Sequence, residues 1–189
     1  MALLRMRNAA FSLGTCSAGP VTLDVRPGER TALPVGSPQE AAVIALMAAG
    51  IAKASSGCVL IGDYDPRVQS VNCKRIAGFV PHEPVSVRER DFAGYIAYRA
   101  ALWKVNTRNA LAYAAVLRER LADMHEAFAY PLIGALIGMP KLVVLDRPAL
   151  AYAPQILAVT ETRAVFSTHT NAAAAHAFGR PHALAMTRA

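Results

Sequence analysis

The chain has 189 residues, of which 54% are hydrophobic and 17% are charged, and this composition excludes a disordered chain and fits one compact domain with or without a small subdomain. The net charge of +7 comes from scattered lysines and arginines without a basic run, so no nucleic-acid partner is expected. The three cysteines, Cys16, Cys58 and Cys73, form no metal motif, and the longest apolar runs are shorter than the about 20 residues that span a bilayer, which argues against an integral membrane protein.

The first third of the chain predicts strands and one helix. Its start, "MALLRMRNAAF", has two arginines and no acid, a faint feature of transit peptides, although a short first strand is the favoured interpretation. Apolar segments that end in turns predict strands over residues 19–29, 30–36 and 57–63. Residues 37–54 predict a helix in which Ser37 is the N-cap, Pro38 lies in the first turn and Glu40 completes a capping box.

The middle third predicts mostly helix. A strand over residues 75–81, stopped by Pro81, comes first. Three helices are then expected over residues 87–104, 108–121 and 124–139, with Ser86, Thr107 and Asp123 at their starts and a bend at Pro131.

The last third returns to alternating strands and helices. Residues 141–146 form a short apolar run that ends in an acid, which is typical of a buried parallel strand, and residues 164–168 form the next. A helix is expected over residues 171–179 with Gly179 at its C-cap, and a closing strand over residues 182–187. Strands and helices that alternate around a helical middle third predict an α/β sheet with a helical insertion.

Several segments in this order resemble the nucleotide-binding domain of ABC transporters. "LDVRPGERTAL" is similar to the strand and turn before the Walker A loop of that family, and "IAGFVPHEP" to its Q-loop region. "PKLVVLDRP" resembles Walker B, "VFSTHT" the H-loop and "FGRPHAL" the C-terminal segment. The resemblance covers residues 11–185, and it is carried by the order and spacing of the segments more than by any one of them.

The resemblance implies an α/β fold of the P-loop NTPase type. A mostly parallel core sheet, an N-terminal antiparallel β part and a reduced helical subdomain are expected. The implied division places residues 1–84 and 140–189 in the two parts of the ABC-type core and residues 85–139 in the helical subdomain.

The Walker A positions depart from the family pattern. In the family, this loop wraps phosphates with backbone N–H groups, neutralises them with a lysine and holds Mg²⁺ through a hydroxyl. Pro38 lacks an N–H, and Glu40 places a carboxylate beside the expected phosphates, where like charges 4 Å apart repel by about 4 kcal/mol. No lysine or metal-binding hydroxyl occurs at the last two positions of the degenerate loop, whose residues are Val35, Gly36, Ser37, Pro38, Glu40, Ala41 and Ala42.

The other motif positions of the implied ATP site also depart from the family pattern. The catalytic glutamate position after Asp146 holds Arg147, which cannot accept a proton at neutral pH, and the Q-loop glutamine position holds His82. Asp146 and His169 remain as vestigial catalytic candidates. The signature motif, the D-loop aspartate and the adenine-stacking residue align with residues 122–126, Ala153 and Leu13.

Structural roles compete with these functional ones. Asp146 is favoured as an acid at a strand end held by Arg147 or by helix N–H groups, and His169 as a hydrogen-bonding core histidine. Asp123 is favoured as a helix N-cap. Arg147 is expected to pair with Glu40 across the vacant site or to stay with Asp146. The histidines show no spacing typical of zinc sites, so no metal site is expected.

We therefore expect a non-hydrolysing structural or regulatory partner of a membrane transport complex. Its partners would be an integral membrane permease, another ABC-type subunit, or both, with a homodimer or heterodimer possible. The expected place is cytoplasmic, peripheral on the inner face of the plasma membrane, and no cofactor is expected. The alternative is a divergent ABC ATPase that binds and hydrolyses ATP with Mg²⁺ at a non-standard site, and a soluble scaffold is the weaker third hypothesis.

Overall fold

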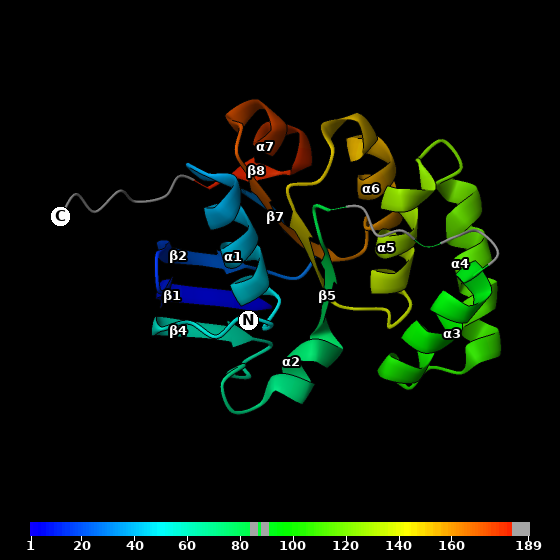
Figure 1. Cartoon of the computed structure of the whole chain (residues 1–189), viewed down its shortest axis with the longest axis horizontal. Coiled ribbons are helices and arrows are strands. Elements are labelled where there is room, and N and C mark those ends of the chain that lie inside the picture. Colours follow the sequence, from blue (N-terminus) through cyan, green and yellow to red (C-terminus); the bar gives the residue numbers. More distant parts are fainter. Residues whose placement is uncertain (84–86, 88–90, 183–189) are drawn as a thin grey trace.

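A parallel sheet of five strands forms the centre of the computed structural model, which describes residues 1–83, 87 and 91–182 (Figure 1). Its strand order is β5-β6-β7-β3-β8, and every neighbouring pair is parallel. The strands β6 and β7 are buried along their whole length, as expected for parallel strands covered on both faces. The five strands are β3 (Arg30–Pro34), β5 (Ala77–Val80), β6 (Leu142–Asp146), β7 (Ala164–His169) and β8 (Arg180–Pro181).

A second, antiparallel sheet has the order β2-β1-β4. It consists of β1 (Leu4–Leu13), β2 (Cys16–Val25) and β4 (Ser56–Ile61). The strand interpretation of the N-terminal residues is thus confirmed. The strand β1 lies between its two partners, and both pairings are interrupted by irregularities in register around residues 7–10.

Helix α1 (Pro38–Ala48) lies between the two sheets, in contact with β2, β6 and β7 (Figure 1). Its inner face is made of small and medium apolar side chains, including Ala41 and Ile44, that are fully buried. The expected helix over residues 37–54 is too long. Gly50, with φ +70, turns the chain back, and the N–H groups of Ile51 and Ala52 close the helix end on the Leu46 carbonyl.

Two helical segments were not expected from the sequence. Helix α2 (Ser70–Ile76) takes the first two residues of the strand predicted over 75–81, which is therefore wrong at its start. Its N-cap, Gln69, makes no side-chain capping bond, so no local signal marks it. The short helices η2 (Leu150–Tyr152) and α6 (Ala153–Val159) follow β6.

Three helices form one end of the molecule, where α5 packs on β5 and the other two pack on α5 and on each other (Figure 1). They are α3 (Phe92–Trp103), α4 (Thr107–Arg120) and α5 (Glu126–Leu136), and Pro131 lies inside α5. The prediction that Asp123 caps the third helix is wrong. His125 caps α5 by accepting a hydrogen bond from the Ala127 N–H, since only a residue next to the first turn can reach that group. The expected helix starting at Ser86 lies partly outside the described residues.

The C-terminal helix matches the sequence prediction. Helix α7 (Ala172–Phe178) begins at Asn171, whose Oδ1 accepts from the Ala173 N–H at 2.7 Å, and it ends at Gly179. The predicted closing strand over 182–187 lies almost wholly outside the described residues. Within the described ranges, no helix is both long and apolar enough to cross a bilayer.

Candidate functional site

The predicted site residues gather at one edge of the parallel sheet. Val35, Asp146 and His169 lie at or just beyond the carboxyl ends of β3, β6 and β7, and His82 follows β5. Because neighbouring parallel strands end at the same edge, topology brings together residues that are far apart in sequence. The start of α1 lies at the same edge.

The loop that precedes α1 satisfies its own hydrogen-bonding groups. Ser37 Oγ accepts from the Glu40 N–H at 3.1 Å, and Glu40 Oε2 accepts from the Gly36 N–H at 3.1 Å. The Val35 N–H donates to the His169 carbonyl at 2.8 Å. Pro38 occupies the first turn, where its missing N–H costs nothing. The chain's own carboxylate thus lies at the positive end of the helix, which is where an anion would otherwise bind.

The two positions that align with the family's lysine and hydroxyl offer no ligand to a phosphate. Ala41 is fully buried and belongs to the core between the two sheets. Ala42 is half-buried on the next position of the helix. A methyl group supplies neither a cation nor a metal-binding oxygen.

Asp146 and Arg147 form a close, largely buried ion pair. Arg147 Nε donates to Asp146 Oδ1 at 2.8 Å and Arg147 NH2 to Asp146 Oδ2 at 3.1 Å. The side chains are only 6% and 19% exposed. Of the two partners expected for Arg147, Asp146 is the one observed, and the described part of the chain shows no hydrogen bond or ion pair between Arg147 and Glu40. Both oxygens of the carboxylate are therefore engaged by a guanidinium.

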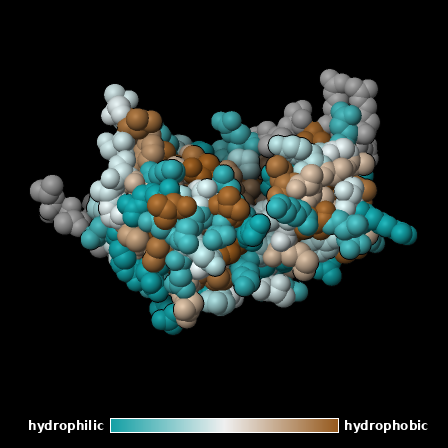
Figure 2. All heavy atoms as spheres, turned by 90° about the horizontal axis from the view of Figure 1, so that it is seen from below, coloured by the Kyte–Doolittle hydropathy of each residue, from teal (hydrophilic) through white to brown (hydrophobic). Residues whose placement is uncertain are grey.

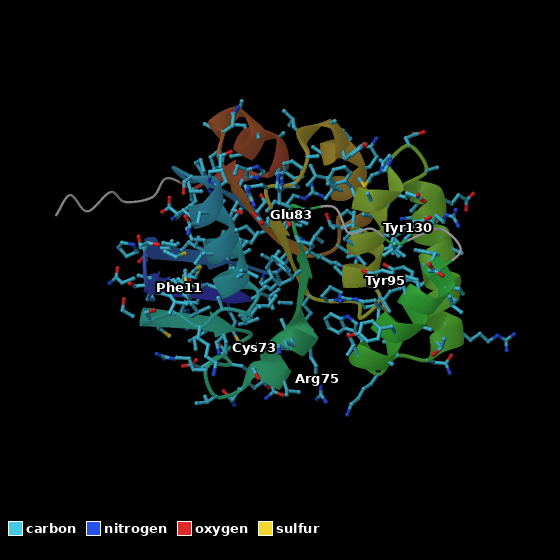
Figure 3. The ribbon with its side chains drawn as sticks, viewed as in Figure 1. Phe11, Cys73, Arg75, Glu83, Tyr95 and Tyr130 are labelled. Atoms are coloured by element: carbon cyan, nitrogen blue, oxygen red, sulfur yellow. The ribbon has the colours of Figure 1, made fainter. Side chains whose placement is uncertain are left out.

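The backbone of Arg147 is held from two further sides. Its N–H donates to the Thr168 carbonyl at 3.0 Å, and its carbonyl accepts from His82 Nδ1 at 2.8 Å. Because a carbonyl can only accept, the His82 ring must carry a proton on Nδ1. The pKa of Arg147 is raised, first by its hydrogen bonds to Asp146 and to a smaller extent by the negative charges of Asp146 and Glu83. Glu83 lies beyond the end of β5 (Figure 3).

His169 is a buried core residue in this structure. Its Nε2 lies 2.8 Å from Ser167 Oγ, and its ring packs on Phe178 with centroids 5.2 Å apart. Only 1% of the residue is exposed. Burial lowers the pKa of His169 to about 4, so the ring is neutral at physiological pH and offers no charge to a phosphate.

The remaining aligned positions serve local structure. His125 caps α5, and Glu126 Oε2 accepts a hydrogen bond from the Tyr130 hydroxyl at 2.9 Å. Ala153 is buried at the start of α6, and Leu13 is 72% exposed at the end of β1.

The sequence did not point to three residues that complete the site. Ser167 and Thr168 contact His169 and Asp146 from β7, and Glu83 follows His82. Their positions beside predicted site residues were the available signal, but hydroxyl groups in a buried strand are not distinguished by pattern from other core positions.

The cavity beside Asp146 and Arg147 is small. A cavity of about 30 Å³ lies between Asp146 and Arg147 and the helical side chains of Phe128 and Tyr152, which is space for about one or two water molecules. Throughout the described ranges, no three His, Cys, Asp or Glu side chains are grouped so that they could hold a metal ion.

The fold is shared with solved ATP-binding cassettes. The ATP-binding subunit of an ABC transporter matches with a TM-score of 0.77 and 15% identity, over 94% of this chain and 83% of that one. The protein cbiO1 from Clostridium perfringens, part of the ABC transporter complex cbiONQ, matches with a TM-score of 0.64 and 14% identity, over 89% and 78% of the two chains. The dimeric cassette MJ0796 bound to ADP and Pi matches with a TM-score of 0.69 and 14% identity, over 94% and 92%.

Sequence comparison adds no further assignment: no protein-family model and no curated protein matches the chain. The structural matches show that the chain has the fold of an ABC transporter nucleotide-binding domain, as the sequence resemblance implied.

Proposed function

We propose that this chain is a non-hydrolysing, ABC-type subunit that acts as a structural or regulatory partner of a membrane transport complex. The observation that carries the proposal is the bidentate contact between Arg147 and Asp146, at 2.8 and 3.1 Å. The guanidinium of Arg147 binds both oxygens of the Asp146 carboxylate, which would have to face a metal ion in a hydrolytic site. It also stands where a hydrolytic enzyme of this fold needs a proton acceptor, a role that arginine cannot fill.

The phosphate side of the site supports the same proposal. Glu40 returns its carboxylate to the Gly36 N–H, so an added phosphate would meet a negative charge and an amide that is already engaged. With Ala41 and Ala42 at the next positions, the described loop supplies no compensating cation. These terms together weaken phosphate binding by several kcal/mol, and about 1.4 kcal/mol is tenfold in affinity.

The surface that we assign to the permease is a groove between the sheet core and the helices beside it. This lower groove has a volume of about 580 Å³ and opens between α2 and α3. Figure 2 views the molecule from below, where brown patches are bordered by teal. The apolar lining of the lower groove includes three well-exposed side chains, Ile51, Val71 and Leu102, together with Phe79 and Trp103.

The rim of the lower groove is basic. Arg75 projects from α2 at the lower edge of the molecule (Figure 3). No acidic side chain is found among the described residues that line the groove, whose cations are Lys74, Arg75, Arg99 and Lys104. An apolar floor with a cationic rim fits an amphipathic segment that carries carboxylates. A position at the inner face of the plasma membrane suits the net charge of +7 as well, because that leaflet is anionic.

A second ABC-type subunit is the other proposed partner. The matched MJ0796 cassette is dimeric and the matched cbiO1 is part of a larger complex. A homodimer and a heterodimer are both compatible with this proposal.

Equilibrium binding of a fluorescent ATP analogue with Mg²⁺ tests the loss of nucleotide binding. We expect no saturable binding below millimolar concentrations. Micromolar binding that disappears in Asp146→Asn would contradict the proposed loss of nucleotide binding and favour the divergent ATPase. A nucleotide-binding cassette with an intact phosphate loop, measured in parallel, shows that the assay detects binding.

Co-purification from detergent-solubilised membranes tests the partner. We expect an integral membrane protein to be retained by the wild type and by Tyr98→Asp, and to be lost from Leu102→Asp. Both residues are exposed on α3, but only Leu102 lines the lower groove, so the pair separates docking from a general effect of added charge. Retention of no membrane protein would favour the soluble scaffold.

A further inference from the structure

The segment after β5, taken as the described residues 81–83, leaves the sheet beside the end of β6. Val80, the last residue of β5, pairs with Leu145, and the next residues along these two strands lead to His82 and to Arg147. Helices α3, α4 and α5 all follow these residues in the chain.

Arg147 contacts three strand ends at once. Its guanidinium holds Asp146 at the end of β6, its N–H donates to Thr168 in β7, and its carbonyl accepts from His82 after β5. The negative charge of Glu83, which follows β5, also attracts the Arg147 guanidinium. One residue therefore ties together the ends of three strands that are separated in sequence.

The backbone of Arg147 is itself in an uncommon conformation. Its φ is +43, in the left-handed region that is unfavourable for a residue with a side chain. Such conformations persist where the surrounding contacts over-determine them, and they concentrate at clamps and switches. The contacts to Asp146, Thr168 and His82 supply that support here.

We propose that Arg147 and His82 form an internal latch that fastens the segment after β5 to the sheet without any bound ligand. The latch rests on the proposed function in one respect. Arg147 keeps its hydrogen bonds to Asp146 only while no metal-bound nucleotide competes for that carboxylate. It gives the non-hydrolysing subunit one fixed arrangement at this edge, where the cavity of about 30 Å³ separates Arg147 from Phe128 on α5.

Nuclear magnetic resonance of the full chain tests the latch through its distinctive hydrogen bond. With histidine labelled by ¹⁵N, we expect the neutral His82 ring in the wild type to carry its proton on Nδ1, and the signal to be assigned through its loss in His82→Ala. A His82 ring protonated on Nε2 alone would overturn the latch, because Nδ1 could then not donate to the Arg147 carbonyl.

Amide hydrogen exchange measures how firmly the latch closes. We expect exchange at the residue 147 amide to rise about fivefold in His82→Ala, from the loss of one neutral hydrogen bond, and about tenfold in Asp146→Asn, from the loss of the charged one. His176→Ala, which changes an exposed histidine on α7, is the control and leaves this amide unchanged. Unchanged exchange in His82→Ala and Asp146→Asn alike would overturn the proposal.

A second experiment distinguishes a failure of this inference from a failure of the proposed function. Millimolar Mg²⁺ and ATP are added to the wild type, and exchange is followed at residues 36–42. Slower exchange there would contradict the proposed loss of nucleotide binding, whereas the latch is decided by the His82 tautomer and by the variants without nucleotide.

Discussion

The Glu40 carboxylate accepts a hydrogen bond from the Gly36 N–H at 3.1 Å, one residue before the N-cap of its own helix. In a capping box, the third helical residue returns to the N–H of the N-cap itself. The bond here reaches one residue further back and folds the acid over the loop. The start of α1 therefore carries its own anion, which makes an external phosphate unnecessary for the helix.

Replacement of Ser37 tests how much the loop gains from this cap. Ser37→Ala removes the oxygen that accepts from the Glu40 N–H, and we expect the free energy of unfolding to fall by about 1 kcal/mol. Urea unfolding measures this as a lower midpoint with an unchanged slope. Gln39→Ala, at an exposed position in the same turn, is the matched control, and an equal loss in both variants would argue against the cap.

Restoring the lysine alone is expected not to restore a nucleotide site. Ala41 is fully buried in the core, so Ala41→Lys forces a long charged side chain into packed space. We expect a loss of more than about 3 kcal/mol, since overpacking costs about 1–3 kcal/mol and burial of an unpaired charge adds to it. Gln39→Lys adds the same charge at an exposed position and should change stability by less than about 0.5 kcal/mol. Gain of micromolar ATP binding by Ala41→Lys would contradict this expectation.

Removal of the Arg147 side chain should destabilise the native state. Arg147→Ala leaves the buried Asp146 carboxylate without its cation, and we expect a loss of about 2–4 kcal/mol, near the lower end for broken buried pairs because Arg147 remains partly exposed. Arg147→Gly should lose about 1 kcal/mol less, because glycine adopts a φ of +43 without strain. Denaturant unfolding compares the three proteins. Equal stability of the glycine and alanine variants would show that the left-handed backbone relaxes freely.

His169 should make the protein acid-sensitive. Its folded-state pKa of about 4 lies below the value of about 6.5 expected in the unfolded chain, because burial disfavours the imidazolium. Between these values the unfolded chain binds a proton that the native state does not. Stability should therefore fall by about 1.4 kcal/mol per pH unit as the pH drops from 6.5 towards 4, and level off below.

The His169→Gln variant isolates this contribution. Glutamine keeps a hydrogen-bonding side chain near Ser167 but does not titrate in this range. We expect the difference in the free energy of unfolding between the wild type and the variant to change by about 1.4 kcal/mol between pH 5 and 6, which corresponds to one proton. A difference that is independent of pH would mean that His169 binds protons equally in the folded and the unfolded chain, so that burial does not lower its pKa.

Strong local signals predicted most of the elements. Apolar runs such as residues 141–146 and the cap at Ser37 mark their elements directly. Helix α2 escaped prediction because its N-cap makes no capping bond, and the assignment of Asp123 as a cap was wrong because His125 lies closer to the first turn. The error in the cap of α5 lies where two neighbouring candidates offer similar local chemistry and tertiary packing selects between them.

The candidate site shows the same division. The residue types at positions 40, 41 and 147 already indicated an altered phosphate loop and a missing base, since these are properties of single side chains. The partner of Arg147 was left open between Glu40 and Asp146. The sequence does not fix the distance from Arg147 to either carboxylate. In the structure, Arg147 pairs with Asp146.

The amino-acid sequence by itself determined which groups this chain can bring to its site: two carboxylates, a guanidinium, two methyl groups and a set of histidines. The order of apolar strands and helices also determined the α/β architecture, because periodicity and turn chemistry act over a few residues. Only the tertiary structure decided that His82, Asp146 and Thr168 converge on Arg147, and that burial keeps His169 neutral. Hydrogen bonds and desolvation depend on distances between distant segments, which are fixed once the sheet has assembled.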